Sequence, residues 1–179
     1  MSERETSNDD LGRLEQQGDA WRVVFSRRFV HPVEKVWRAV SEPEHLAAWF
    51  PGRVEGELRA GAPLKFVVET GDTFDGETVM FEPPKVLEIR WGTDVLHIEL
   101  QPDGDGTVMT FVDTLTELGK AARDGAGWHE CLARLVAHLD DAPRPEDGVV
   151  WKAVYPRYQE AFGSEASTIG PPEGHGYSD

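Results

Sequence analysis

The chain has 179 residues, of which 33 are acidic and 18 are basic, so its formal net charge is -15. This charge argues against nucleic-acid binding, because contact with phosphates requires a basic patch. No run of about 18 apolar residues occurs, and the polar, acidic N-terminus lacks the pattern of a secretory signal. We therefore expect a cytoplasmic protein with one folded domain and no membrane span.

Acidic residues are concentrated at both ends of the chain. Residues 1–19 hold six acids and two bases, and residues 163–179 hold three acids and no base. Polar segments of this kind cannot bury enough apolar surface to fold. We predict disordered tails at 1–19 and 163–179, a domain at 20–141 and a C-terminal helical extension at 142–162.

The segment after the first tail predicts one strand and two short helices. Residues 21–30, WRVVFSRRFV, are rich in the β-branched and aromatic residues that strands favour. Pro32 opens the helical pattern PVEKVWRAVS, and Pro43 opens a second one, PEHLAAWF, which ends before Pro51.

Between Gly52 and Leu115 the pattern changes to six strands. Short turn-forming stretches such as GDTFD, PPK and PDGDG separate them, which favours an antiparallel meander. In VLEIRW and VLHIELQ apolar residues alternate with charged ones, so we expect one face of the sheet to be buried and the other to be exposed to solvent. His97 lies on the solvent-exposed face. We therefore expect it to be a cross-strand neighbour of charged residues rather than a metal ligand.

A long amphipathic helix is predicted after the meander, with a capping box formed by Thr114 and Glu117. Apolar residues recur every three or four positions and form one stripe, which we expect to lie along the sheet. The residues of the stripe are Leu118, Ala121, Gly125, Trp128, Leu132, Leu135 and Leu139. Gly125 and Gly127 each weaken a helix by about 1 kcal/mol relative to alanine, a cost that is tolerated where the backbone must approach a neighbour closely or leave space.

Within this helix, GWHECLARLVAH at residues 127–138 gathers groups that are often catalytic. His129 and His138 lie nine residues apart, on opposite sides of the helix, so the HExxH pattern of a zinc protease is incomplete. Glu130 points away from the stripe and is expected to pair with Arg134 at the surface. The sequence shows no basic side chain that would activate the Cys131 thiol as a nucleophile. We predict no metal site, no cofactor and no catalytic residue, since phosphate loops, nucleophile elbows and dinucleotide fingerprints are also missing.

The stretch VHPVEKVWRAVSEPEHLAAWFPG resembles the opening signature of the SRPBCC (START-like) superfamily, in the branch similar to the C-terminal domain of the activator of Hsp90 ATPase. The matching residues are Pro32, Val36, Trp37, Pro43, Trp49, Pro51 and Gly52. Further matches to the family pattern follow later in the chain: Gly61 before a strand, Pro83 and Pro84 before VLEIRW, and Gly127 with Trp128. The resemblance extends from about Val23 to Phe162.

This resemblance implies an α+β helix-grip fold, in which a curved antiparallel sheet wraps a long C-terminal helix around a cavity. The cavity of such proteins holds a small hydrophobic or amphipathic ligand. By position, seven residues are expected to line it: Trp49, Phe66, Trp91, Met109, Phe111, Trp128 and Leu132. The alternative is that these side chains fill the core and leave no void.

The extension places aromatic residues at helical spacing, interrupted by Pro156, which predicts a kinked or two-part helix packed on the domain. These residues are Trp151, Val154, Tyr155, Tyr158 and Phe162. Two roles remain open for them, covering the mouth of the pocket or forming the contact of a homodimer.

Three classes of function are compatible with these features, and the first is our prediction. It is a protein that binds a small hydrophobic molecule. The second is a co-chaperone module with an Hsp90-type partner. The third is a cyclase-like or aromatase-like enzyme, for which Asp113 and His129 are the candidate polar groups of the cavity.

Overall fold

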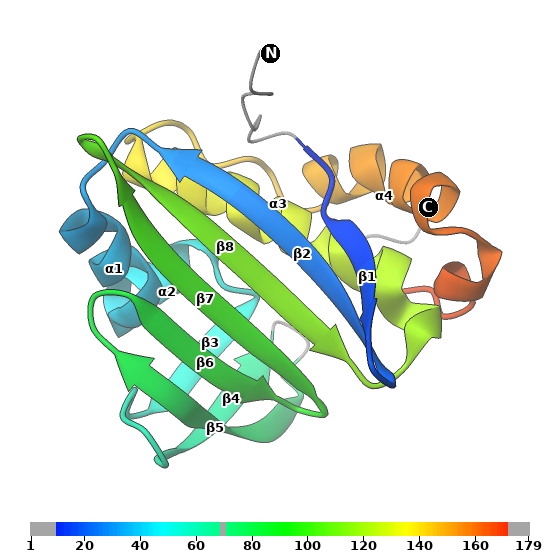
Figure 1. Cartoon of the computed structure of the whole chain (residues 1–179), viewed down its shortest axis with the longest axis horizontal. Helices are drawn as coiled ribbons and strands as arrows, with labels where there is room; N and C mark the ends of the chain where they lie inside the picture. Colours follow the sequence, from blue (N-terminus) through cyan, green and yellow to red (C-terminus); the bar gives the residue numbers. More distant parts are fainter. Residues whose placement is uncertain (1–9, 69–70, 172–179) are drawn as a thin grey trace.

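The computed structural model describes residues 10–68 and 71–171, and it has the predicted α+β helix-grip fold. Eight antiparallel strands form one curved sheet in the order β1-β2-β8-β7-β6-β5-β4-β3. The long helix α3 lies across one face of the sheet, and α4 lies beside its N-terminal half (Figure 1). The meander from β3 to β8 is closed by β2, which pairs with β8.

The strands are β1 (Arg13–Gln17), β2 (Ala20–Phe29), β3 (Gly52–Gly56), β4 (Pro63–Val68), β5 (Thr73–Glu82), β6 (Val86–Trp91), β7 (Asp94–Asp103) and β8 (Gly106–Leu115). The α-helices are α1 (Val33–Ser41), α2 (Pro43–Trp49), α3 (Ala121–Leu139) and α4 (Val149–Phe162). Two short 3-10 helices are η1 (Leu118–Lys120) and η2 (Ser164–Ser167). Within the described residues, none of the helices is long and apolar enough to cross a membrane.

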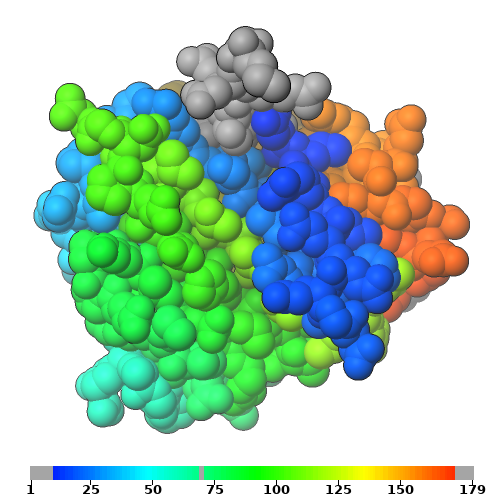
Figure 2. Space-filling model, in the orientation of Figure 1, coloured from blue at the N-terminus to red at the C-terminus, as the bar shows by residue number. Residues whose placement is uncertain are grey.

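The prediction of a disordered tail at 1–19 is wrong for the residues that the structure describes. Residues 13–17 form β1, which pairs with β2 across the two-residue turn of Gly18 and Asp19. Gly18 has a φ of 60°, a conformation that glycine adopts without strain. In the space-filling view β1 lies beside α4 (Figure 2). Residues 1–9 lie outside the described part.

The C-terminal tail is also structured in part, contrary to the prediction for 163–179. η2 buries Ala166, and the amide of Ile169 donates a hydrogen bond of 3.0 Å to the carbonyl of Gly119 in η1, which precedes the long helix. Residues 172–179 lie outside the described part of the chain.

The two faces of the sheet are as the alternation predicts. Met109, Phe111 and Asp113 on β8 all point inward and are buried. On the outer face, His97 Nδ1 lies 3.1 Å from a carboxylate oxygen of Glu88 on the neighbouring strand. His97 is therefore a cross-strand neighbour of a carboxylate.

The apolar stripe of α3 packs against the inner face of the sheet, but the helix begins later than predicted. Thr114 belongs to β8 and Glu117 precedes η1 without a side-chain cap, so the predicted capping box is wrong. The N-cap residue of α3 is Lys120, also without a capping side chain. The strand extends to Leu115 because its pairing with β2 continues to that residue.

The prediction that Glu130 and Arg134 face water is also wrong. Both side chains are buried, with exposed fractions of 2% and 5%. The cause is α4, which packs along a side of α3 next to the apolar stripe and buries Trp151, Val154 and Tyr158. α4 runs without interruption through Pro156, so the extension is not a two-part helix.

Gly125 explains how closely α4 approaches α3. A methyl group at Gly125 would lie 3.0 Å from one ring carbon of Tyr158 and 3.1 Å from the next. The Tyr158 ring is fully buried, and its hydroxyl is bonded to the Gly12 amide at 2.8 Å, so it cannot move aside easily. Gly127, by contrast, has no other described atom within 4 Å of the same position.

We predict opposite effects of alanine at these two glycines. Gly127→Ala should raise the free energy of unfolding by up to about 1 kcal/mol, because alanine favours the helix and meets no neighbour. Gly125→Ala should lower it by about 1 kcal/mol, because overpacking against Tyr158 outweighs the same helical gain. Urea unfolding of the two variants and the unchanged chain measures both effects. An equal stabilisation by both substitutions would contradict the close packing of α3 and α4.

Candidate functional site

An open cleft of about 850 Å³ lies between one end of the sheet and α3. The α2–β3 junction, β4, β5 and the β6–β7 turn form one side of it, and α3 and the C-terminal extension form the other. Its size is in the range of pockets that bind small organic molecules.

Aromatic side chains form one wall of the cleft. Trp91, at the end of β6, has its ring centroid 5.1 Å from that of Phe50, 4.5 Å from that of Phe74 and 5.6 Å from that of Trp128. The first two of these pairs are edge-to-face, an arrangement that stabilises aromatic clusters. Trp151 of α4 adds a further ring to the lining. The wall therefore presents apolar rings drawn from five separate segments.

Three carboxylates meet near one end of this wall. One oxygen each of Asp94, Asp113 and Asp124 lies within 4.8 Å of the other two. Lys120 Nζ lies 2.8 Å from Asp94, and Arg123 Nε lies 2.8 Å from Asp124, so two of the three carboxylates have a basic partner. Oxygen ligands of this kind suit a hard divalent cation, but the ammonium and guanidinium already supply positive charge here.

Asp113 has no basic partner of its own within this cluster. Its Oδ2 accepts a hydrogen bond of 3.1 Å from Trp128 Nε1, while its buried Oδ1 has no hydrogen-bond partner among the described residues. Burial, reinforced by the nearby carboxylates of Asp124 and Asp94, raises the pKa of Asp113 well above its usual value. Burial likewise raises the pKa of Asp124, against the opposing effect of Arg123. Asp113 therefore acts mainly on Trp128, whose indole it holds in the cleft wall.

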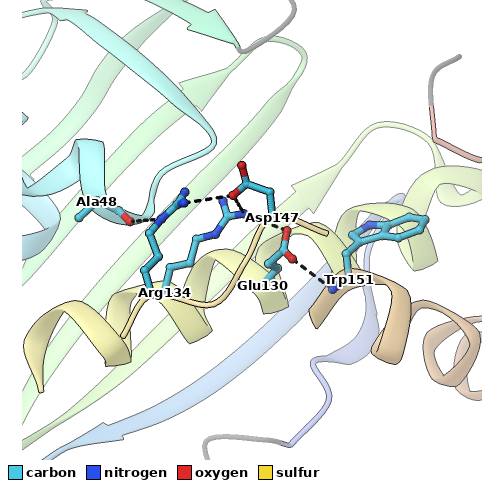
Figure 3. A network of polar contacts seen from close by, with 6 residues as sticks. Ala48, Glu130, Arg134, Asp147 and Trp151 are labelled. Atoms are coloured by element: carbon cyan, nitrogen blue, oxygen red, sulfur yellow. Dashed lines mark hydrogen bonds and ion pairs between the residues drawn. The ribbon is translucent and has the colours of Figure 1, made fainter. Parts of the chain in front are cut away.

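The other polar contact of the cleft is a buried ion pair on α3. Arg134 Nη2 lies 3.2 Å from Glu130 Oε2, one helical turn away. The second oxygen of Glu130 accepts a hydrogen bond of 3.3 Å from the backbone amide of Trp151, in the first turn of α4 (Figure 3). Glu130 thus neutralises Arg134 and also satisfies an amide that the start of α4 leaves without an intrahelical partner.

The same arginine binds the segment that precedes α4. Arg134 Nη2 donates a hydrogen bond of 2.6 Å to Asp147 Oδ1, and Arg144 Nη1 donates to the same oxygen at 3.1 Å. Arg144 Nε also donates to the carbonyl of Ala48 in α2, at 3.4 Å. These contacts join α2, α3 and the C-terminal segment at the rim of the cleft.

The seven residues that the sequence suggested for ligand contact fall into two groups, those that line the cleft and those that are buried behind it. Trp91 and Trp128 line the cleft. The other five are fully buried in the core behind it: Trp49, Phe66, Met109, Phe111 and Leu132. Phe66 supports the wall from behind, with its ring centroid 4.6 Å from that of Trp91.

Neither polar candidate lines the cleft. Asp113 lies behind Trp128, and His129 faces α4, where its Nδ1 is 2.8 Å from the hydroxyl of Tyr158. Burial raises the pKa of Tyr158, so the hydroxyl keeps its proton, and it accepts a hydrogen bond from the Gly12 amide. Burial also raises the pKa of the Cys131 thiol to about 12, which leaves it unreactive.

Sequence reasoning missed several residues of the cleft, chiefly Phe50, Arg134, Arg144 and Trp151. Phe50 had a usable signal, because it is apolar and adjoins the Pro51 turn that ends α2. Arg144 had none, since it lies in a proline-rich segment without periodicity, and only the fold brings it to the cleft.

We predict that Asp113→Asn reduces the pH dependence of stability. Below the ordinary pKa of an aspartate, about 4, the carboxyl is protonated in both the folded and the unfolded chain. As the pH rises, the unfolded chain releases this proton first, so the free energy of unfolding falls. The fall ends once the pH passes the raised pKa of the folded state. Asparagine does not titrate and still accepts from Trp128.

Thermal unfolding between about pH 4 and pH 8 measures this effect. The variant should be at least as stable as the unchanged chain at neutral pH and should lose less stability on going there from acid. The exposed Asp105→Asn serves as the control. A larger loss of stability toward neutral pH in Asp113→Asn would contradict a protonated Asp113.

Comparison with known proteins agrees with this architecture. A model of the family described as "Activator of Hsp90 ATPase homolog 1-like protein" matches residues 30–140. No curated protein matches the chain in sequence.

Several solved structures are similar to this chain. A conserved protein of unknown function from Enterococcus faecalis, EF2215, has a TM-score of 0.70 and 21% identity, over 83% of this chain and 88% of that chain. CalU16 from Micromonospora echinospora has a TM-score of 0.68 and 24% identity, over 86% and 96% of the two chains. DynU16, from the dynemicin biosynthetic locus, has a TM-score of 0.62 and 29% identity, over 73% of this chain and 51% of that chain.

Proposed function

Because this chain belongs to the family of activator of Hsp90 ATPase homolog 1-like proteins, whose fold encloses a long helix, we propose that it binds a small hydrophobic or amphipathic molecule between its sheet and α3. The observation that carries this proposal is the open cleft of about 850 Å³ with Phe50, Phe74, Trp91 and Trp128 in its wall. Exposed aromatic faces bind flat apolar molecules by stacking and by release of water.

Two further features support a binding role. The aromatic wall is fixed before any ligand arrives, because the Trp128 indole is bonded to Asp113 and the Trp91 ring is packed among its neighbours. A preformed wall lowers the entropy cost of binding. DynU16 is a protein from a biosynthetic locus, and a role in binding a small molecule here is consistent with that likeness.

Gly127 offers a way to block the cleft without disturbing the core. It lines the cleft on α3, and a side chain added there enters open space. We predict that Gly127→Leu folds normally and lowers the affinity for an aromatic probe by roughly tenfold or more, because the isobutyl group occupies the binding volume. Quenching of tryptophan fluorescence by a naphthalene derivative, together with its effect on the melting temperature, measures binding.

The matched control is Ala133→Leu, which adds a leucine to the same helix outside the cleft lining. This variant should bind the probe as the unchanged chain does. The proposed function fails if naphthalene derivatives neither quench the fluorescence nor shift the melting temperature of the unchanged chain, or if both leucine variants bind equally well.

A further inference from the structure

The cleft has a charge opposite to that of the chain as a whole. Acidic residues outnumber basic ones by 33 to 18 in the sequence. Among the described residues that line the cleft, five are basic and three are acidic. The basic residues are Arg53, Lys120, Arg123, Arg134 and Arg144, and the acidic ones are Asp94, Asp124 and Glu130.

We propose that the ligand of the cleft is an organic anion, an aromatic or apolar body with a carboxylate, and that Arg134 and Arg144 bind this carboxylate. The inference rests on the proposed function and specifies the class of ligand. It also assigns a role to Asp147, as the group that occupies the anion position when no ligand is bound.

Two of the five basic residues are paired with aspartates of the wall, and a third, Arg134, is neutralised by the buried Glu130. Lys120 is paired with Asp94, and Arg123 with Asp124, in both cases at 2.8 Å between side chains that are mostly buried. Arg53 is paired with Glu55 at 2.8 Å, but both of these side chains are largely exposed, where an ion pair has little strength. The remaining basic residues, Arg134 and Arg144, converge on one point.

That point is a single carboxylate oxygen. Asp147 Oδ1 accepts hydrogen bonds from Arg134 at 2.6 Å and from Arg144 at 3.1 Å. Arg134 is buried and fixed by Glu130, whereas the side chain of Arg144 is 49% exposed and is bonded to the Ala48 carbonyl at 3.4 Å. A buried and a half-exposed guanidinium group directed at one oxygen form a site that favours a carboxylate.

Asp147 is suited to be a replaceable occupant of this site. Its side chain is 50% exposed, and it lies in the segment between α3 and α4, outside any helix or strand. It does not line the cleft, whereas both arginines do. A carboxylate that enters from the cleft would replace Asp147 without changing the net charge next to the buried Glu130.

The position of the anion relative to the aromatic wall sets the shape of the ligand. Trp151 lines the cleft, and its backbone amide is bonded to Glu130, the partner of Arg134. Trp151 and the two arginines therefore belong to one lining, in which the Trp151 ring points away from Arg134 (Figure 3). A molecule that carries a carboxylate on a ring system can occupy this lining.

Naphthoate and naphthamide test this inference, because they share a ring system and differ in charge. We expect naphthoate to bind the unchanged chain more tightly than naphthamide does, and Arg144→Ala to remove that preference by weakening naphthoate binding about tenfold. Asp147→Ala should strengthen naphthoate binding severalfold, because the competing carboxylate is gone, and should leave naphthamide binding unchanged. Arg59→Ala, which removes an exposed arginine outside the cleft, should alter neither.

The results separate this inference from the function on which it rests. Equal affinities for the two probes, or no response of naphthoate to either Arg144→Ala or Asp147→Ala, would overturn the anion site while leaving a binding cleft. An equal loss of naphthoate binding in Arg53→Ala and Arg144→Ala would also overturn it, because the general charge of the cleft would then hold the anion. Binding of neither probe would overturn both the anion site and the proposed function.

Discussion

The buried ion pair between Glu130 and Arg134 is the contact on which the cleft depends. Each group is nearly inaccessible to water, so each would be costly to bury alone, and removal of one partner of such a pair typically costs about 3–5 kcal/mol. The pair also binds the C-terminal extension. Glu130 bonds the first turn of α4, and Arg134 bonds Asp147 in the preceding segment. The position of the C-terminal extension therefore follows from two side chains of α3.

This arrangement makes the extension part of the functional surface. Trp151 and Arg144 line the cleft only because the extension is held against α3. The sheet and α3 supply a rigid aromatic wall, and the extension supplies a further ring and a guanidinium. The result is a cleft with an apolar side and a cationic rim in a strongly acidic chain. This charge distribution is the basis of the proposal that the cleft binds an amphipathic anion.

Local patterns in the sequence were sufficient for the elements of the fold but not for the environment of each side chain. The two-residue alternation of VLEIRW and VLHIELQ and the three-to-four spacing on α3 report which face is apolar, so the sheet, the helix and the burial of Trp128 were predictable. Glu130 was predicted to face water because helical spacing tells which side of the helix a residue lies on. It does not tell which later segment packs against that side. β1 was missed because an edge strand such as RLEQQ buries little, although the Gly18 turn marked it. Arg144 and Asp147 meet Arg134 through long-range folding alone.

Hydrogen–deuterium exchange of a Glu130→Ala variant tests most directly whether the buried pair holds the extension in place. The account predicts at least tenfold faster exchange in α4 and in the segment that precedes it, and a smaller increase in β6, β7 and β8. Glu57→Ala, which removes one partner of an exposed ion pair, should leave all of these segments unaffected. Protection of α4 equal to that of the unchanged chain would contradict the account, since the extension would then be held by its apolar contacts without the ion pair.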